Sequence, residues 1–118
     1  MHKQWLESAI KKMETAANRI QDNIPYQSYD GKYRFTNRTP DQEPLWSIGF
    51  ELKTTERIEC WTNGFWGGIL WLLYDKTGNG NYKQYAEGLE ARLDCVLDGF
   101  VDISHDAGFM WMHTSGAN

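Results

Sequence analysis

Apolar residues recur at helical spacing through the first part of the chain. The spacing i, i+3, i+4, i+7 is followed by Leu6, Ala9, Ile10, Met13, Ala17, Ile20 and Ile24. This pattern predicts an amphipathic helix that ends before Pro25, because the residue before a proline avoids helical backbone angles. Such a helix needs a partner surface to cover its apolar stripe.

The stretch from residue 26 to residue 58 has no helical period and contains several prolines and glycines. Two short segments within it, KYRFTNR and LWSIGFEL, have the composition of extended pieces. A connection of this length is uncommon in a compact helical protein and is often functional.

A second helix is expected over residues 64–76, with Thr62 or Asn63 as its N-cap. Its sequence GFWGGILWLLYDK has no polar face, which predicts a helix that is buried on all sides. Two other helices can hardly surround such an element in a chain of 118 residues. Trp66 and Trp71 are interpreted as core residues of this helix.

A third helix is predicted over residues 82–100, where the spacing of apolar positions is clearest. Its polar side carries Lys83, Glu87, Glu90, Asp94 and Asp98. The turn DKTGNGN joins the two helices into an antiparallel hairpin. It resembles the start of a calcium loop, but Ala86 stands where the bidentate Glu should be. The predicted class is all-α, with about three helices and long loops.

Charge and composition narrow the function. The net charge of −4 and the absence of a basic face argue against a nucleic-acid partner. Every run of 18 residues contains charge, so no membrane span is expected. No secretory signal is recognised at the N-terminus, and Cys60 and Cys95 fit no metal or redox spacing. A reducing, cytoplasmic location is therefore expected.

The residue pair His105-Asp106 is the first candidate for chemistry. It lies after the third helix and before Gly108, in a loop near aromatic residues, where a carboxyl group can act as an acid or stabilise positive charge. A simple turn or capping role for Asp106 stays open. Another possibility is a metal site formed with His113, although no established metal-binding spacing is present. Trp61 is equally compatible with packing and with a pocket wall.

Two ordered motifs carry a family resemblance. WTNGFWGGILWLLYDKTGNGNY at 61–82, followed by HDAGFMW at 105–111, resembles the family-88 glycoside hydrolases, the unsaturated glucuronyl hydrolases. The resemblance covers about residues 60–112, and Gly67 stands where many members carry Pro or Ser. It implies an (α/α)6 barrel, of which residues 1–118 would be one N-terminal partial domain. Neighbouring helices of that barrel would then enclose the apolar second helix.

The resemblance also implies a reaction on oligosaccharides that end in a 4,5-unsaturated uronic acid. An acid protonates C4, water adds at C5, and the hemiketal rearranges to release the sugar. Asp106 matches one of the two active-site carboxylates, and the main proton donor is expected beyond Asn118. His105 matches a pocket histidine, while Trp61 and Asn63 match the wall near the sugar. No metal or organic cofactor is expected.

Two alternatives to catalysis remain for the chain as given. One is a non-catalytic carbohydrate-binding module, in which Trp61 and Trp111 stack on sugar rings. The other is a self-associating helical fragment, because part of a toroid exposes apolar faces that favour association.

Overall fold

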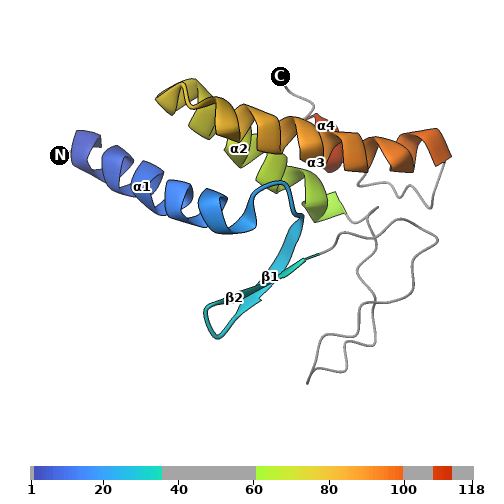
Figure 1. Cartoon of the computed structure of the whole chain (residues 1–118), viewed down its shortest axis with the longest axis horizontal. Helices are drawn as coiled ribbons and strands as arrows, with labels where there is room; N and C mark the ends of the chain where they lie inside the picture. The colour runs from blue at the N-terminus through green and yellow to red at the C-terminus, as the bar shows by residue number, and fades with distance from the viewer. Residues whose placement is uncertain (1, 36–60, 100–107, 113–118) are drawn as a thin grey trace.

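The computed structural model describes residues 2–35, 61–99 and 108–112 (Figure 1). Helices make up most of this described part, and its strands form one hairpin. The predicted all-α class is confirmed. In Figure 1 the helices α2 (Phe65–Thr77) and α3 (Gly80–Gly99) run side by side, and the C-terminal part of α1 lies beside α2.

Helix α1 spans His2–Ile20 and ends earlier than the sequence pattern predicts. Gln21 has a φ of 56°, in the left-handed region, so the helix cannot continue toward Pro25. Ile24 is nevertheless fully buried, because the turn after the helix returns its side chain to the core. The spacing of apolar residues therefore predicted the burial of Ile24 correctly, but it predicted the wrong end for the helix.

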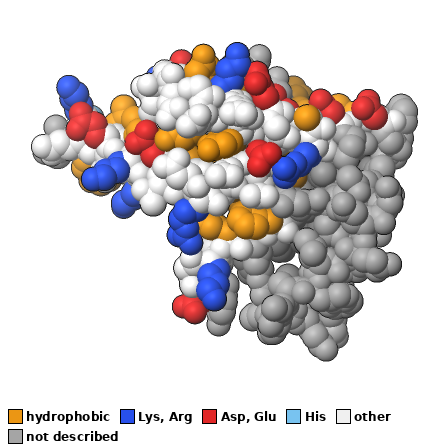
Figure 2. Space-filling model, viewed as in Figure 1, with side chains coloured by type: hydrophobic (Ala, Val, Ile, Leu, Met, Phe, Trp, Pro, Cys, Tyr) orange, Lys and Arg blue, Asp and Glu red, His pale blue; other side chains and the backbone are white. Residues whose placement is uncertain are grey.

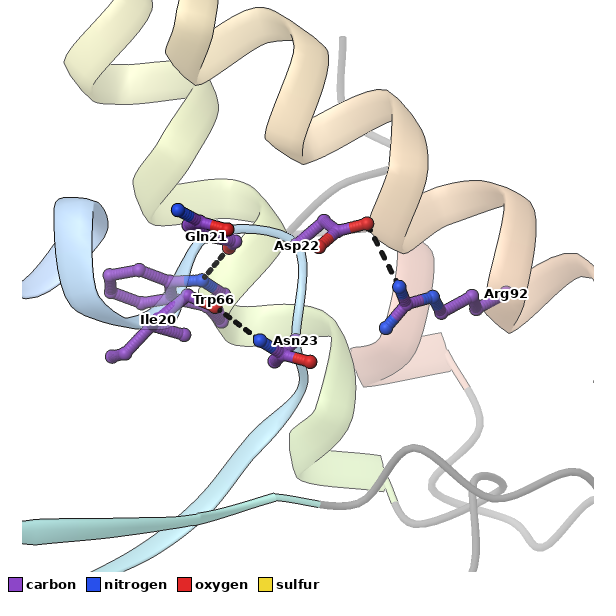
Figure 3. Close-up of polar contacts among 6 residues, drawn as sticks. All are labelled: Ile20, Gln21, Asp22, Asn23, Trp66 and Arg92. Atoms are coloured by element: carbon purple, nitrogen blue, oxygen red, sulfur yellow. Dashed lines mark hydrogen bonds and ion pairs between the residues drawn. The ribbon is translucent and has the colours of Figure 1, made fainter.

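The turn after α1 is attached to both of the other long helices (Figure 3). The indole Nε1 of Trp66 donates a hydrogen bond to the carbonyl oxygen of Gln21, at 3.0 Å. The guanidinium of Arg92 contacts Oδ2 of Asp22 at 2.9 Å. Because Trp66 belongs to α2 and Arg92 to α3, this turn fixes the end of α1 against the α2–α3 pair.

The next two elements are β1 (Pro25–Tyr29) and β2 (Lys32–Phe35), which pair as an antiparallel hairpin. Asp30 and Gly31 connect them with φ values of 48° and 68°, which is the geometry of a type I′ turn. Arg19 of α1 donates to the carbonyl oxygen of Gly31 at 2.8 Å and so ties the hairpin tip to the helix. The extended piece expected in KYRFTNR is thus confirmed for β2, while LWSIGFEL lies outside the described residues.

The start of the second long helix differs from the prediction. A short 3-10 helix, η1 (Trp61–Gly64), precedes α2 (Phe65–Thr77). The N-cap of α2 is Gly64, which has no side chain and so makes no side-chain capping hydrogen bond. The prediction that Thr62 or Asn63 caps α2 is therefore wrong, because both residues lie inside η1 instead of at its junction with α2.

Burial of α2 is one-sided. Trp66, Leu70 and Leu73 face the core, whereas Leu72 is 64% exposed and Phe65 is 41% exposed. The prediction of a helix buried on all sides is wrong for this chain. The reason is geometric, since α1 and α3 cover one side of α2 and leave the rest of its apolar surface in contact with solvent.

The predicted α2–α3 hairpin is confirmed. Gly78 adopts a left-handed conformation with φ 69°, and its N–H donates to the carbonyl oxygen of Tyr74 at 2.8 Å. Oδ1 of Asn79 then accepts a hydrogen bond from the N–H of Asn81 at 3.0 Å, in the first turn of α3 (Gly80–Gly99). A glycine and an asparagine therefore end one helix and start the next.

One hydrophobic core joins these elements. α2 and α3 contribute most of it, with the end of α1 on one side and the short helix α4 (Gly108–Trp111) on another. Its buried members are Ala17, Ile20, Ile24, Trp66, Leu70, Leu73, Tyr82, Ala86, Leu89, Leu93 and Met110. The core role predicted for Trp66 is confirmed, and Trp71 packs against the core from its edge.

Charged side chains of both signs are spread over the face of the molecule in Figure 2. Small areas of hydrophobic side chains lie between them, so the described part of this face has no patch of a single charge. None of the described helices has the length and apolarity needed to cross a membrane.

Candidate functional site

The two sequence motifs meet in space. η1 contains the first four residues of one motif, and α4 contains the last four residues of the other. The two short helices pack together with Cα–Cα separations of 8 Å or less. Segments far apart in the sequence are thus neighbours at one end of the α2–α3 pair, and this junction is the candidate site.

A buried side chain from each helix forms the junction. Met110 of α4 is 0% exposed and belongs to the hydrophobic core. Asn63 of η1 is 1% exposed, and it is the one polar residue in the described part that is fully buried. A buried carboxamide has both donor and acceptor groups, which normally make hydrogen bonds in the interior. The junction therefore contains a buried polar side chain beside the hydrophobic core.

The structure describes the predicted site residues unevenly. Asn63 is placed at the junction, as given above. Trp61 begins η1, but its side chain is outside the description. His105 and Asp106 both lie outside the described residues, which resume at Gly108. The helix that follows Asp106 in the sequence is α4, and it lies at the junction. The site roles of Trp61, Asn63, His105 and Asp106 stay predictions.

Trp111, for which only a stacking role was predicted, also has a buried polar group. Its indole Nε1 is buried and has no hydrogen-bond acceptor among the described residues. The indoles of Trp66 and Trp71 behave differently, because they donate to the Gln21 carbonyl at 3.0 Å and to Oε1 of Glu90 at 2.6 Å. No sequence pattern distinguishes these three tryptophans, since the direction of an indole N–H depends on tertiary packing.

Glu90 was also misplaced by the sequence pattern, which put it on the polar side of the third helix. It is partly buried between α2 and α3, where it accepts the hydrogen bond from Trp71. Burial raises the pKa of Glu90, the Trp71 hydrogen bond opposes that rise, and the charges of Asp94 and Glu87 add to it. The carboxyl group of Glu90 therefore links α2 to α3. It is not part of η1 or α4, the two short helices that form the candidate site.

Two parts of the chain have residue types found in metal sites, the turn between α2 and α3 and the segment from His105 to His113. Within residues 2–35, 61–99 and 108–112, no group of three His, Cys, Asp or Glu side chains is placed to hold an ion. The turn between α2 and α3 is the segment that resembles the start of a calcium loop. Its left-handed Gly78 and the hydrogen bond accepted by Asn79 identify it as a connection between two helices. The other possible set, His105, Asp106 and His113, lies outside the described residues.

Comparison with known proteins gives a partial likeness. The chain is similar to an unsaturated glucuronyl hydrolase. That protein, from Bacillus sp. (strain GL1), is 44% identical over 52 residues, which are 43% of this chain. The match spans 14% of the length of the relative. No protein-family model matches the chain, and no solved structure matches it. The likeness supports a relation to that family over the matched stretch.

Proposed function

We propose that this chain is part of a glycoside hydrolase that acts on oligosaccharides with a terminal 4,5-unsaturated uronic acid. The observation that carries the proposal is the contact between η1 and α4, which joins the two motifs that resemble this family. The relative with 44% identity over 52 residues has the corresponding name. In this proposal residues 1–118 form an N-terminal partial domain of an (α/α)6 barrel.

Asp106 is proposed as one of the two active-site carboxylates. It precedes Gly108 by two residues, so covalent geometry keeps its Cα within about 7 Å of the Cα of Gly108. Because α4 begins at Gly108 and packs on η1, this limit supports a position of Asp106 near the junction. His105 and Trp61 are proposed as sugar-binding neighbours, together with Asn63.

The proposed reaction is the hydration of an enol ether. A proton is added to C4 of the unsaturated ring, a water oxygen forms a bond to C5, and the proton of that water passes to a base. The resulting hemiketal rearranges and releases the sugar, so one water is consumed for each bond cleaved. A carboxylate next to C5 stabilises the positive charge that develops there, and a carboxylic acid supplies the proton.

Loss of the ultraviolet absorbance of the conjugated C=C–COO⁻ group measures this reaction. Because the reaction needs two carboxylates and Asp106 supplies one, we expect residues 1–118 alone to leave the absorbance of an unsaturated chondroitin disaccharide unchanged. In a protein that also supplies the second carboxylate, we expect the absorbance to be lost and Asp106→Asn to reduce the rate at least about a hundredfold. Asp98→Asn is the matched control, because Asp98 is an exposed residue on α3. A rate within a few-fold of the wild type for Asp106→Asn would refute the assignment of that residue.

Binding of sugar without catalysis is the second candidate function. The tryptophans near the junction favour it, because indole rings stack on sugar rings. Titration with the same disaccharide, followed by tryptophan fluorescence, would give a saturable change without loss of the absorbance. Absence of both signals would exclude this candidate as well as the catalytic one for that sugar.

Self-association is proposed as a separate property of the chain. The first turns of α1 extend beyond the turn between α2 and α3 (Figure 1). Large apolar side chains are exposed along α1. Trp5 is 77% exposed, Leu6 is 53% exposed and Met13 is 37% exposed. Apolar stripes of this kind favour association in water. Light scattering should show oligomers that Leu6→Glu reduces, whereas a monomer at all concentrations would contradict the proposal.

A further inference from the structure

Helix α2 has an apolar side that the rest of the chain leaves exposed. Phe65 is 41% exposed and Leu72 is 64% exposed. These two residues are seven positions apart, so they lie on the same side of the helix, with the half-buried Ile69 between them. Exposed apolar side chains grouped in this way indicate a surface that another element can cover.

A second exposed apolar surface lies on the first half of α1. Leu6 and Met13 are also seven positions apart, and Trp5 adjoins Leu6; these three residues are the α1 stripe. Residues 2–9 are all exposed, whereas Ile20 at the other end of the helix is buried. The helix is therefore docked on the rest of the chain through its second half.

The two surfaces cannot meet within one chain. The Tyr82 hydroxyl donates to Oε1 of Glu14 at 3.2 Å and so holds the middle of α1 against the start of α3. The indole of Trp66 holds the Gln21 carbonyl just after the helix. N-terminal to Glu14 the helix projects past the turn between α2 and α3 (Figure 1). A continuous helix cannot fold back from there onto the uncovered side of α2, so both surfaces stay open to solvent in a single copy.

The area of these surfaces distinguishes two ways of pairing two copies. The exposed parts of Trp5, Leu6 and Met13 amount to roughly 400 Å² per copy, so a contact between two α1 stripes buries roughly 800 Å² in total. Stable interfaces bury about 1,200–2,000 Å². Inclusion of Phe65 and Leu72 raises the total for two copies to roughly 1,200 Å². A contact that uses both surfaces of each copy therefore reaches the size of a stable interface.

We propose that residues 1–118 form a two-fold dimer, in which the α1 stripe of each copy packs on the exposed side of α2 in the other copy. Two-fold symmetry makes the two contacts identical, so one arrangement covers both surfaces of both chains. This inference rests on the self-association proposed above and adds its second surface. In the proposed (α/α)6 barrel neighbouring helices would cover this side of α2, and the partner copy takes their place here.

Complementation between two variants tests this arrangement. Leu6→Lys places a charge in the α1 stripe and Leu72→Glu places one on α2, and both residues are exposed, so each variant should fold. Each variant alone should dimerise at least about tenfold more weakly than the wild type in sedimentation equilibrium. A mixed dimer keeps one unaltered contact, and its other contact brings the two introduced charges of opposite sign together. An equimolar mixture should therefore dimerise more tightly than either variant alone.

Gln4→Glu is the matched control, because Gln4 is an exposed residue of α1 on the side opposite the stripe. It should dimerise as the wild type does. Circular dichroism and urea unfolding establish that each variant is folded. If Leu72→Glu does not fold, Phe65→Glu replaces it, since Phe65 lies on the same side of α2.

Three results would overturn this inference, and they differ in what they leave standing. If Leu72→Glu dimerises as the wild type does and Leu6→Lys does not, α2 is outside the interface, but the proposed self-association through α1 remains. If both variants are weakened and their mixture is no tighter than either alone, α1 does not pack on α2 of the other copy. If the wild type is a monomer at all concentrations, both the inference and the proposed self-association are wrong.

Discussion

Replacement of Gly88 by alanine tests how the turn after α1 docks on α3. Alanine is favoured over glycine inside a helix by about 0.8–1.0 kcal/mol, so an unobstructed site would gain that amount. Here an added Cβ would lie 3.1 Å from Oδ2 and 3.3 Å from Cβ of Asp22. Both separations are shorter than ordinary van der Waals contact, so Asp22 has to move.

The cost of that movement falls on the ion pair. Oδ2 of Asp22 lies 2.9 Å from the guanidinium of Arg92, and the two side chains are 37% and 36% exposed. An ion pair exposed to this degree contributes about 0–1 kcal/mol. The backbone of the turn cannot easily yield, because Trp66 holds the neighbouring Gln21 carbonyl. Loss of the ion pair can cancel the helix gain, so we expect Gly88→Ala to change the free energy of unfolding by about zero, instead of by the about +0.8–1.0 kcal/mol of an unobstructed site.

A double-mutant cycle isolates the contact. In an Asp22→Gly background both obstructing atoms are absent, so Gly88→Ala should stabilise the chain by about 1 kcal/mol relative to Asp22→Gly alone. In an Arg92→Ala background the carboxylate of Asp22 is free of its ion pair and can rotate away from residue 88. Gly88→Ala should then recover part of that stabilisation. Urea unfolding of each variant, with an unchanged m-value, gives the free energies. Equal stabilisation by Gly88→Ala in all backgrounds would refute the docking of Asp22 against α3.

Three further changes have defined outcomes. Trp66→Phe removes the hydrogen bond to Gln21 and should destabilise the chain by about 1–3 kcal/mol in urea unfolding; an unchanged midpoint would contradict that bond. Gly78→Ala should cost about 1–2 kcal/mol in the same measurement, because φ at this residue is 69°, and a neutral effect would exclude the left-handed cap. Burial raises the pKa of Glu90 in the folded state, so the folded state binds this proton more tightly than the unfolded state does. The contribution of Glu90 to stability is therefore greatest below its pKa in the unfolded state, and it is lost as pH rises through its pKa in the folded state. Glu90→Gln keeps an oxygen that can accept from Trp71, and it should raise Tm at pH 7 but not below about pH 4. An equal rise in Tm at both pH values would show that burial of the charged carboxylate is not the cause.

The sequence predicted the long helices well because periodic burial is a local signal. The spacing of Tyr82, Ala86, Leu89 and Leu93 identified α3, and all four side chains are buried. Helix ends were predicted less well. The end of α1 depends on one left-handed residue, Gln21, whose side chain does not announce that conformation. The hairpin, by contrast, has a local signal, because Asp30-Gly31 is a dipeptide typical of a type I′ turn.

The environment of α2 could not be derived from its own residues. Its uninterrupted apolar character predicts burial, but exposure depends on which elements are present to cover it. Leu72 and Phe65 remain open to solvent because the described chain supplies neighbours on one side only. The same limit applies to Glu90, since its contact with Trp71 joins two helices whose relative rotation is set by the whole core.

Site residues were predicted by a different route. The motifs identified Asp106, His105, Trp61 and Asn63 through a family resemblance, and no periodicity in the chain points to them. What the structure adds is the contact between η1 and α4, which a resemblance between motifs does not contain. These four assignments remain predictions, and the activity and binding experiments above test them.

The acceptors of the tryptophan side chains separate structural roles from binding roles. Trp66 and Trp71 belong to the same motif as Trp61, yet their indole N–H groups are used inside the fold, one to hold the turn after α1 and one to hold α3. A motif rich in aromatic residues is therefore partly a description of the scaffold, and its resemblance to a hydrolase family would persist in a protein that had lost activity. Trp66 and Trp71 are therefore informative about folding, and their presence in the motif does not by itself indicate activity.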